Sequence, residues 1–212
     1  MIDDAAVSGK EFSTIEKRFR QQIDFIIEID RLKSIFRRTR LYDHSRYEND
    51  AEHAWHMAMM ALVMAEHAND RKIDLCRVVK IALIHDIVEI DAGDTYLYAP
   101  DQTHKHRTEA AAAQRIFGLL PGDQRDEFIA LWEEFEARRT PEAKFARAID
   151  RLGPLMQNHM DNGHAWKKHG VTSDRVLTAT GIIEEGSREI WNYARGLIEE
   201  SVSRGDLARP AE

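Results

Sequence analysis

Cysteine is almost absent from this sequence: Cys76 is the only one among 212 residues. A single cysteine cannot form a disulfide within the chain, so the fold must be stable without one. Cys76 lies among Leu75, Val78 and Val79, where a small apolar side chain packs well. We therefore expect it to be a buried core residue and not a reactive thiol.

Long apolar runs are also missing. The longest, from Met57 to Ala65, is far shorter than the roughly 20 residues that a membrane-spanning helix needs. The first four residues, Met1-Ile2-Asp3-Asp4, are too polar for a signal peptide. We expect a cytoplasmic protein that does not associate with membranes.

The sequence has no excess of positive charge, since its formal net charge is −7. Proteins that bind long nucleic acids carry clustered lysines and arginines that neutralise several phosphates at once. We therefore do not expect this protein to bind long nucleic acids. The 212 residues, 43% of them hydrophobic, suffice for one domain with a buried core. We predict a single domain over residues 1–212 with flexible ends.

Alternating strand patterns, internal repeats and low-complexity blocks are absent as well. Apolar residues instead recur at steps of three and four, which is the spacing of one helix face. Capping residues support several of the predicted starts: Asn49, Asp74, and Thr140 followed by Pro141. We predict an all-α fold, a helical bundle without strands, with a loop over residues 94–103. The predicted helices cover residues 12–36, 49–69, 74–93, 108–119, 123–138, 142–160 and 174–199.

Two polar residues, His85 and Asp86, stand inside the apolar stretch Ile81-Ala-Leu-Ile-His-Asp-Ile-Val-Glu-Ile. An unpaired carboxylate buried there would be costly, so a positive group should compensate it. A helix advances about 100° per residue, from 3.6 residues per turn, so Glu89 shares a sector of the helix surface with this pair. We expect the three side chains to line one pocket.

Two further residues can reach the same centre. His53 lies in the first turn of the preceding predicted helix, and antiparallel packing would bring its ring toward the His-Asp pair. Asp150 shares a helix face with Ala143, Ala146 and Gly153, which leave that helix thin enough for close approach. Asp86 and Asp150 could instead pair with arginines such as Arg147 or Arg151 in a structural network.

Two imidazoles and two carboxylates form a mixed nitrogen and oxygen ligand set. Such a set suits Mn²⁺, Fe²⁺, Co²⁺, Ni²⁺ or Zn²⁺, with Mg²⁺ as a further candidate, and leaves positions open for water and substrate. We predict one divalent metal ion held by His53, His85, Asp86 and Asp150.

The order of these four residues resembles that of the HD-domain metal-dependent phosphohydrolases. The wider pattern is similar to the YfbR/HDDC2-like 5′-deoxynucleotidase group, and it covers roughly residues 32–155, the expected HD core. The residues that carry this resemblance are Leu32-Lys33, Arg37, Arg46, Glu48-Asn49, Glu52-His53, His85-Asp86, Glu89, Gly93-Asp94 and Asp150.

The resemblance implies an enzyme that releases phosphate from nucleoside 5′-monophosphates, and a homodimer. It also implies that Glu89 handles the proton of the attacking water and that Arg37 orients the phosphate. Arg46 ranks second as a phosphate contact, and Thr95 joins the expected substrate-binding residues. Asp94 is expected to contact the sugar or assist the water. Relatives often have an aromatic residue where this chain has Arg38.

Two other functions fit the same metal ligands. One is hydrolysis of a different phosphate ester, such as an alarmone pyrophosphate. That branch typically has Glu-Asp after the His-Asp pair, and here Ile90 follows Glu89. The other is a metal-containing binding module without turnover. Such a module would not need Glu89 beside an intact ligand set, so substitution of Glu89 separates it from an enzyme.

Overall fold

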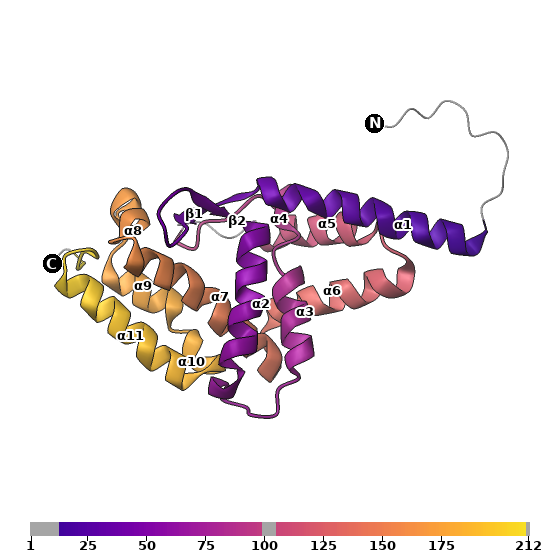
Figure 1. The fold of residues 1–212 in the computed structure, drawn as a ribbon. Coiled ribbons are helices and arrows are strands. Elements are labelled where there is room, and N and C mark those ends of the chain that lie inside the picture. The colour runs from indigo at the N-terminus through magenta and orange to yellow at the C-terminus, as the bar shows by residue number, and fades with distance from the viewer. Residues whose placement is uncertain (1–12, 99–104, 211–212) are drawn as a thin grey trace.

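The computed structural model describes residues 13–98 and 105–210. Within them the chain is predominantly helical, and this confirms the all-α class (Figure 1). The predicted start at Phe12, both chain ends and residues 99–103 of the predicted loop lie outside the described residues. The helices are α1 Thr14–Ile29, α2 Asp50–Met64, α3 Leu75–Ile84, α4 Glu89–Ala92, α5 Lys105–Phe117, α6 Gly122–Ala137, α7 Pro141–Met160, α8 His164–His169, α9 Ser173–Thr180, α10 Ile183–Gly186 and α11 Arg188–Ser203.

The predicted helix starts are confirmed where capping residues marked them. The Asn49 side chain accepts a hydrogen bond from the Glu52 amide at 3.0 Å, and the Glu52 carboxylate accepts one from the Asn49 amide. Asp74 caps α3. Thr140 caps α7, with Pro141 at its first position. These side chains satisfy amides that have no partner inside the helix, and they fix where α2, α3 and α7 begin.

The prediction of a helix through Phe36 was wrong. Helix α1 ends at Ile29, a 3₁₀ turn covers Asp30–Ser34, and β1 Phe36–Arg40 then pairs antiparallel with β2 Tyr47–Asn49. The sequence did not reveal this two-stranded sheet because β1, Phe-Arg-Arg-Thr-Arg, has no apolar alternation. The hairpin places Arg37 near the start of α2.

Helix α7 lies at the centre of the fold and contacts α2, α3, α6, α10 and α11, while α2 and α3 pack side by side against it (Figure 1). Ala143 and Ala146 on α7 are fully buried. A Cβ atom at Gly153 would come within 4.0 Å of His53 Cε1. A side chain as small as alanine would therefore fit at Gly153, and it is the fully buried alanines that let α7 pack closely in the core, as the sequence suggested.

Other helix boundaries differ from the predictions. Helix α3 ends at Ile84, and the chain turns before α4. Helix α4 ends at Ala92, and the next residue, Gly93, has a φ of +73°. The predicted helix over residues 174–199 is divided into α9, α10 and α11. A Cβ at Gly186 would clash with the Lys144 backbone oxygen, so this glycine lets α10 pack onto α7.

Cys76 is exposed, so the expectation that it is buried was wrong. It lies in the first turn of α3, on the side of that helix that faces away from the core. In the described part of the chain, no helix is both long and apolar enough to cross a membrane.

Candidate metal centre and substrate pocket

The two predicted histidine ligands meet between α2 and the end of α3. His53 Nε2 lies 3.2 Å from Asp150 Oδ1 and 3.9 Å from Asp86 Oδ2. His85 Nε2 lies 3.0 Å from Asp86 Oδ2 and 3.8 Å from Asp150 Oδ1. All four residues predicted to bind the metal are therefore brought together.

Outer contacts orient both imidazole rings. His85 Nδ1 donates a hydrogen bond to the Ala82 carbonyl oxygen at 2.8 Å, because that oxygen can only accept. This leaves Nε2 directed at the carboxylates of Asp86 and Asp150. His53 Nδ1 lies 3.6 Å from Glu48 Oε2 on β2. Partners of this kind, on the ring nitrogen away from the ion, are typical of histidines that bind metals.

The arrangement fits a divalent cation. His85 Nε2 is buried and has no hydrogen bond within the described part of the chain, although two carboxylate oxygens lie within 4 Å. Two nitrogen and two oxygen atoms at these distances match the preferences of several transition metals. Asp50, Asp86 and Glu89 form a second group whose oxygens lie within 4.8 Å of one another.

The pKa values reflect this concentration of charge. Burial opposes protonation of His85, but Asp86 and Asp150 outweigh it and raise the pKa of His85 to about 10. Burial disfavours the charged form of Asp86, yet His85 and Arg37 hold the pKa of Asp86 well below its usual range. A cation at this position would replace the proton on His85 as the partner of the carboxylates.

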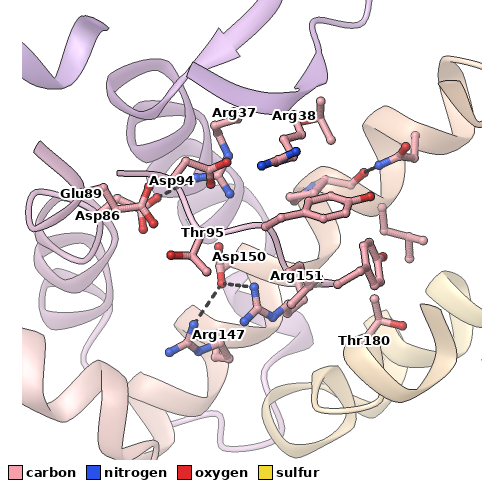
Figure 2. A pocket seen from close by; sticks show the side chains of 17 residues that line it. Arg37, Arg38, Asp86, Glu89, Asp94, Thr95, Arg147, Asp150, Arg151 and Thr180 are labelled. Carbon is pink, nitrogen blue, oxygen red and sulfur yellow. Dashed lines mark hydrogen bonds and ion pairs between the residues drawn. The ribbon is translucent and has the colours of Figure 1, made fainter. Parts of the chain in front are cut away.

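Asp150 also takes part in the structural network that the sequence left open. Its Oδ2 atom lies 3.4 Å from Arg147 Nη1 and 3.3 Å from Arg151 Nη1. Its Oδ1 atom faces the histidines. Figure 2 shows both arginines beside Asp150 at the pocket wall. Pairing with arginines and facing a metal site are thus compatible, because each uses a different oxygen.

Arg37 reaches the same centre from β1. Its Nη1 atom donates to Asp86 Oδ2 at 2.9 Å and to Asp50 Oδ1 at 3.1 Å, and Glu48 Oε2 lies 3.9 Å from its Nε atom. Burial opposes the charge of Arg37, but Asp86 and Asp50 outweigh it and raise its pKa.

Glu89 at the start of α4 is 4% exposed and lies beside Asp50, which is fully buried. Burial, followed by repulsion from Asp86 and Asp50, raises the pKa of Glu89 well above its usual value. Burial and Asp86 likewise raise the pKa of Asp50 to about 6. Sequence reasoning missed Asp50, because an acidic residue in the first turn of a helix is usually explained by the helix dipole.

The centre opens into a pocket whose walls come from β1, the segment after α4, and α7 (Figure 2). The cavity has a volume of about 70 Å³. Asp94 and Thr95 line this pocket, as do Arg38, Arg147 and Arg151. The pocket therefore brings arginine guanidinium groups and a threonine hydroxyl next to the carboxylates of the metal centre.

Arg46 lies elsewhere. Its guanidinium forms two hydrogen bonds with Glu52, at 2.6 and 2.8 Å, and it lines a different hollow beside Tyr42 and Trp55. Trp166 packs in the core with 1% exposure. His169 contacts the ring of Tyr96, which lines the pocket beside the candidate metal centre.

Comparison with known proteins finds similar sequences over most of the chain. Residues 29–191 match the HD domain family. The chain is 34% identical over 158 residues to a human protein named 5′-deoxynucleotidase HDDC2, covering 72% of this chain and 73% of the human one. It is 31% identical over 141 residues to 5′-deoxynucleotidase hdd1 of Schizosaccharomyces pombe, covering 64% of this chain and 69% of that one.

A solved structure is similar over almost the whole length. The crystal structure of a predicted metal-dependent phosphohydrolase from Magnetospirillum magnetotacticum MS-1 superposes with a TM-score of 0.88 at 50% identity. The match covers 93% of this chain and 100% of that one. A conserved hypothetical protein from Pyrococcus furiosus matches with a TM-score of 0.59 at 27% identity, covering 85% of this chain and 99% of that one.

Proposed function

The chain belongs to the HD-domain family of metal-dependent phosphohydrolases, and from this premise we propose that it releases phosphate from nucleoside 5′-monophosphates, deoxynucleotides in particular. One observation carries the proposal: the Nε2 atoms of two histidines converge with two carboxylates beside Arg37 and Glu89 at one pocket. The relatives named 5′-deoxynucleotidases support the choice of substrate.

His53, His85, Asp86 and Asp150 would hold the metal in this proposal. A bound divalent ion lowers the pKa of water and polarises a phosphoryl oxygen, which makes attack on a phosphomonoester possible at neutral pH. The ion that serves in the cell is one of Mn²⁺, Co²⁺, Fe²⁺, Ni²⁺, Zn²⁺ or Mg²⁺.

Arg37 and Glu89 supply the remaining chemistry. The planar guanidinium of Arg37 donates two parallel hydrogen bonds to phosphate oxygens and offsets negative charge that develops during transfer. The carboxylate of Glu89 accepts a proton from the attacking water. Burial, followed by repulsion from Asp86 and Asp50, raises the pKa of this carboxyl group and so strengthens it as a base. Asp94 and Thr95 lie on the segment that crosses the pocket and would contact the sugar.

We also propose that the chain forms a homodimer through apolar residues on the outer face of α1. Ile15, Phe19 and Ile26 are 81%, 64% and 57% exposed, and Ile23 and Ile27 continue this row. A row of large apolar side chains in contact with water favours association with another protein surface.

The test of the activity uses purified protein stripped of metal. It is incubated with ribo- and deoxynucleoside monophosphates and, separately, with Mn²⁺, Co²⁺, Zn²⁺ or Mg²⁺, and released phosphate is measured. Metal-dependent release that is lost in His85→Ala supports the proposal. Absence of release with every nucleotide and metal would refute it.

A further inference from the structure

The substrate pocket extends along α7 well beyond the metal centre. Asp150, Arg151, Pro154, Leu155 and Asn158 all line it, and their spacing is that of one helix face. Asn158 comes eight residues after Asp150, so it lies about 12 Å farther along the helix axis at 1.5 Å per residue. This length is comparable to the distance from the phosphate to the outer edge of the base in a nucleotide.

Three residues that line this pocket each have a buried polar atom without a hydrogen-bond partner in the described part of the chain. These atoms are Thr39 Oγ1, Tyr96 Oη and Asn158 Oδ1. Thr39 is 9% exposed and Asn158 is 5% exposed. Buried polar atoms in folded proteins almost always have a partner, so three at one pocket point to a ligand that supplies partners.

The hydrogen-bonding capacity of Asn158 is fixed by its neighbour. Its Nδ2 atom donates to the Pro154 carbonyl oxygen at 2.9 Å. Because a carbonyl can only accept, the amide cannot be flipped, and Oδ1 is left as an acceptor. The group that binds Asn158 must therefore bring an N–H or O–H. The hydroxyls of Thr39 and Tyr96 can both donate and accept.

Tyr96 is held in place by other side chains. The Arg38 guanidinium lies 4.9 Å from the centre of its ring, and the rings of Tyr98 and His169 lie 5.3 and 4.8 Å away. The ring is thus already covered by neighbours, and the hydroxyl is the part of Tyr96 that is left without a partner.

We propose that Thr39, Tyr96 and Asn158 form a base-binding subsite, in which Asn158 Oδ1 accepts a hydrogen bond from an N–H of the nucleobase. This inference rests on the proposed nucleotidase function. A second phosphate group would be a poor occupant, because a phosphate dianion has no hydrogen to donate to Asn158. The sugar lies too close to the transferred phosphate to reach a residue two helical turns away.

The experiment compares deoxynucleoside 5′-monophosphates with 2-deoxyribose 5-phosphate, which lacks the base. Thr39→Val and Asn158→Leu remove the hydrogen-bonding atoms while largely preserving volume. We expect each to lower kcat/KM for the nucleotides at least about tenfold, mainly through KM, and to leave kcat/KM for the base-free compound unchanged. If the base-free compound is turned over too slowly, its inhibition constant replaces kcat/KM.

Thr180→Val is the matched control. Thr180 lines the same pocket, but its hydroxyl already donates to the Val176 carbonyl oxygen at 2.7 Å. This variant should hydrolyse nucleotides as the wild type does. Tyr96→Phe, which removes a single hydroxyl, provides a third test if Asn158→Leu does not fold, as judged by thermal unfolding.

The outcomes separate the two proposals. Unchanged nucleotide hydrolysis in the folded subsite variants would overturn the base-binding subsite alone. Equal losses for nucleotides and the base-free compound would also overturn it, because the effect would then not depend on the base. If the wild type hydrolyses neither compound with any metal, the nucleotidase function itself fails.

Discussion

Arg37 Nη1 donates a hydrogen bond to Asp86 Oδ2 at 2.9 Å. The proposed phosphate clamp and a proposed metal ligand thus neutralise each other in the absence of an ion. A cation bound to Asp86 competes with Arg37 for that carboxylate. The freed guanidinium is then available to phosphate, while Asp50 and Glu48 keep it in place.

The first prediction is that metal and phosphate bind cooperatively. Addition of Mn²⁺ should tighten binding of inorganic phosphate by about 5- to 150-fold, the usual range of coupling between two sites. Isothermal titration of phosphate with and without Mn²⁺ measures this coupling. Arg37→Lys keeps the positive charge but loses the planar guanidinium that donates two parallel hydrogen bonds. This variant should bind phosphate more weakly and retain its metal affinity. Equal phosphate affinity with and without metal would contradict the prediction.

The second prediction concerns the metal ligands. His53→Ala and His85→Ala should each lower metal affinity by at least about 100-fold, because even loss of an outer partner of a ligand costs 10- to 100-fold. Metal content after dialysis, measured by mass spectrometry, provides the check. His106→Ala is the control, since His106 is exposed on α5. Full metal content in both ligand variants would exclude this centre.

The third prediction follows from the raised pKa of His85. Its pKa of about 10 keeps the ring protonated at neutral pH, so metal binding to Nε2 must release this proton. Metal affinity should therefore rise about tenfold per pH unit near neutrality and level off above pH 10. Calorimetry at pH 7 in buffers with different heats of ionisation counts the protons released. No release would contradict the prediction.

The same shift affects the stability of the metal-free protein. The folded-state pKa of His85 lies above its unfolded value of about 6.5. The contribution of His85 to stability is therefore fully present below about pH 6.5 and is lost as the pH rises through about 10. Chemical denaturation measures the free energy of unfolding of the wild type and of His85→Gln across this pH range. The difference between the two values should become smaller at high pH.

The fourth prediction separates an enzyme from a binding module. Glu89→Gln should lower kcat by about 10²- to 10⁴-fold, the usual contribution of a general base, and leave the metal content unchanged. Asp91→Asn is a control from the same short helix, because Asp91 pairs with Arg115 at its exposed side. Unchanged phosphate release in Glu89→Gln would remove this residue from the mechanism.

The fifth prediction tests the proposed dimer. Phe19→Glu combined with Ile26→Glu places charge in the exposed apolar row of α1 and should convert a dimer into monomers. Sedimentation velocity over a range of protein concentrations measures this change. Gln21→Glu adds charge to an exposed position of the same helix and should not change the mass. A wild-type chain that is monomeric at all concentrations would refute the proposal.

The sequence by itself determined the helical class and the starts of α2, α3 and α7. These features depend on local chemistry, namely the apolar spacing along each helix and caps such as Asn49 and Thr140. It also indicated His85 and Asp86, because adjacent His and Asp residues in an apolar helix need a compensating charge. His53 and Asp150 followed from the expected packing of their helices against this pair.

Tertiary structure decided the parts of the site that depend on packing between distant segments. The β1–β2 hairpin and the turn after α3 place Arg37 and Asp50 around the same centre as Glu89, although no local sequence pattern predicts the contacts of Arg37 or Asp50. The two carboxylate oxygens of Asp150 have different neighbours: Oδ1 lies near the histidines and Oδ2 near the arginines. This arrangement likewise arises only when α7 packs against α2 and α3. Periodicity reports which side of a helix is buried, but the identity of its neighbour is set by the three-dimensional packing of the whole core.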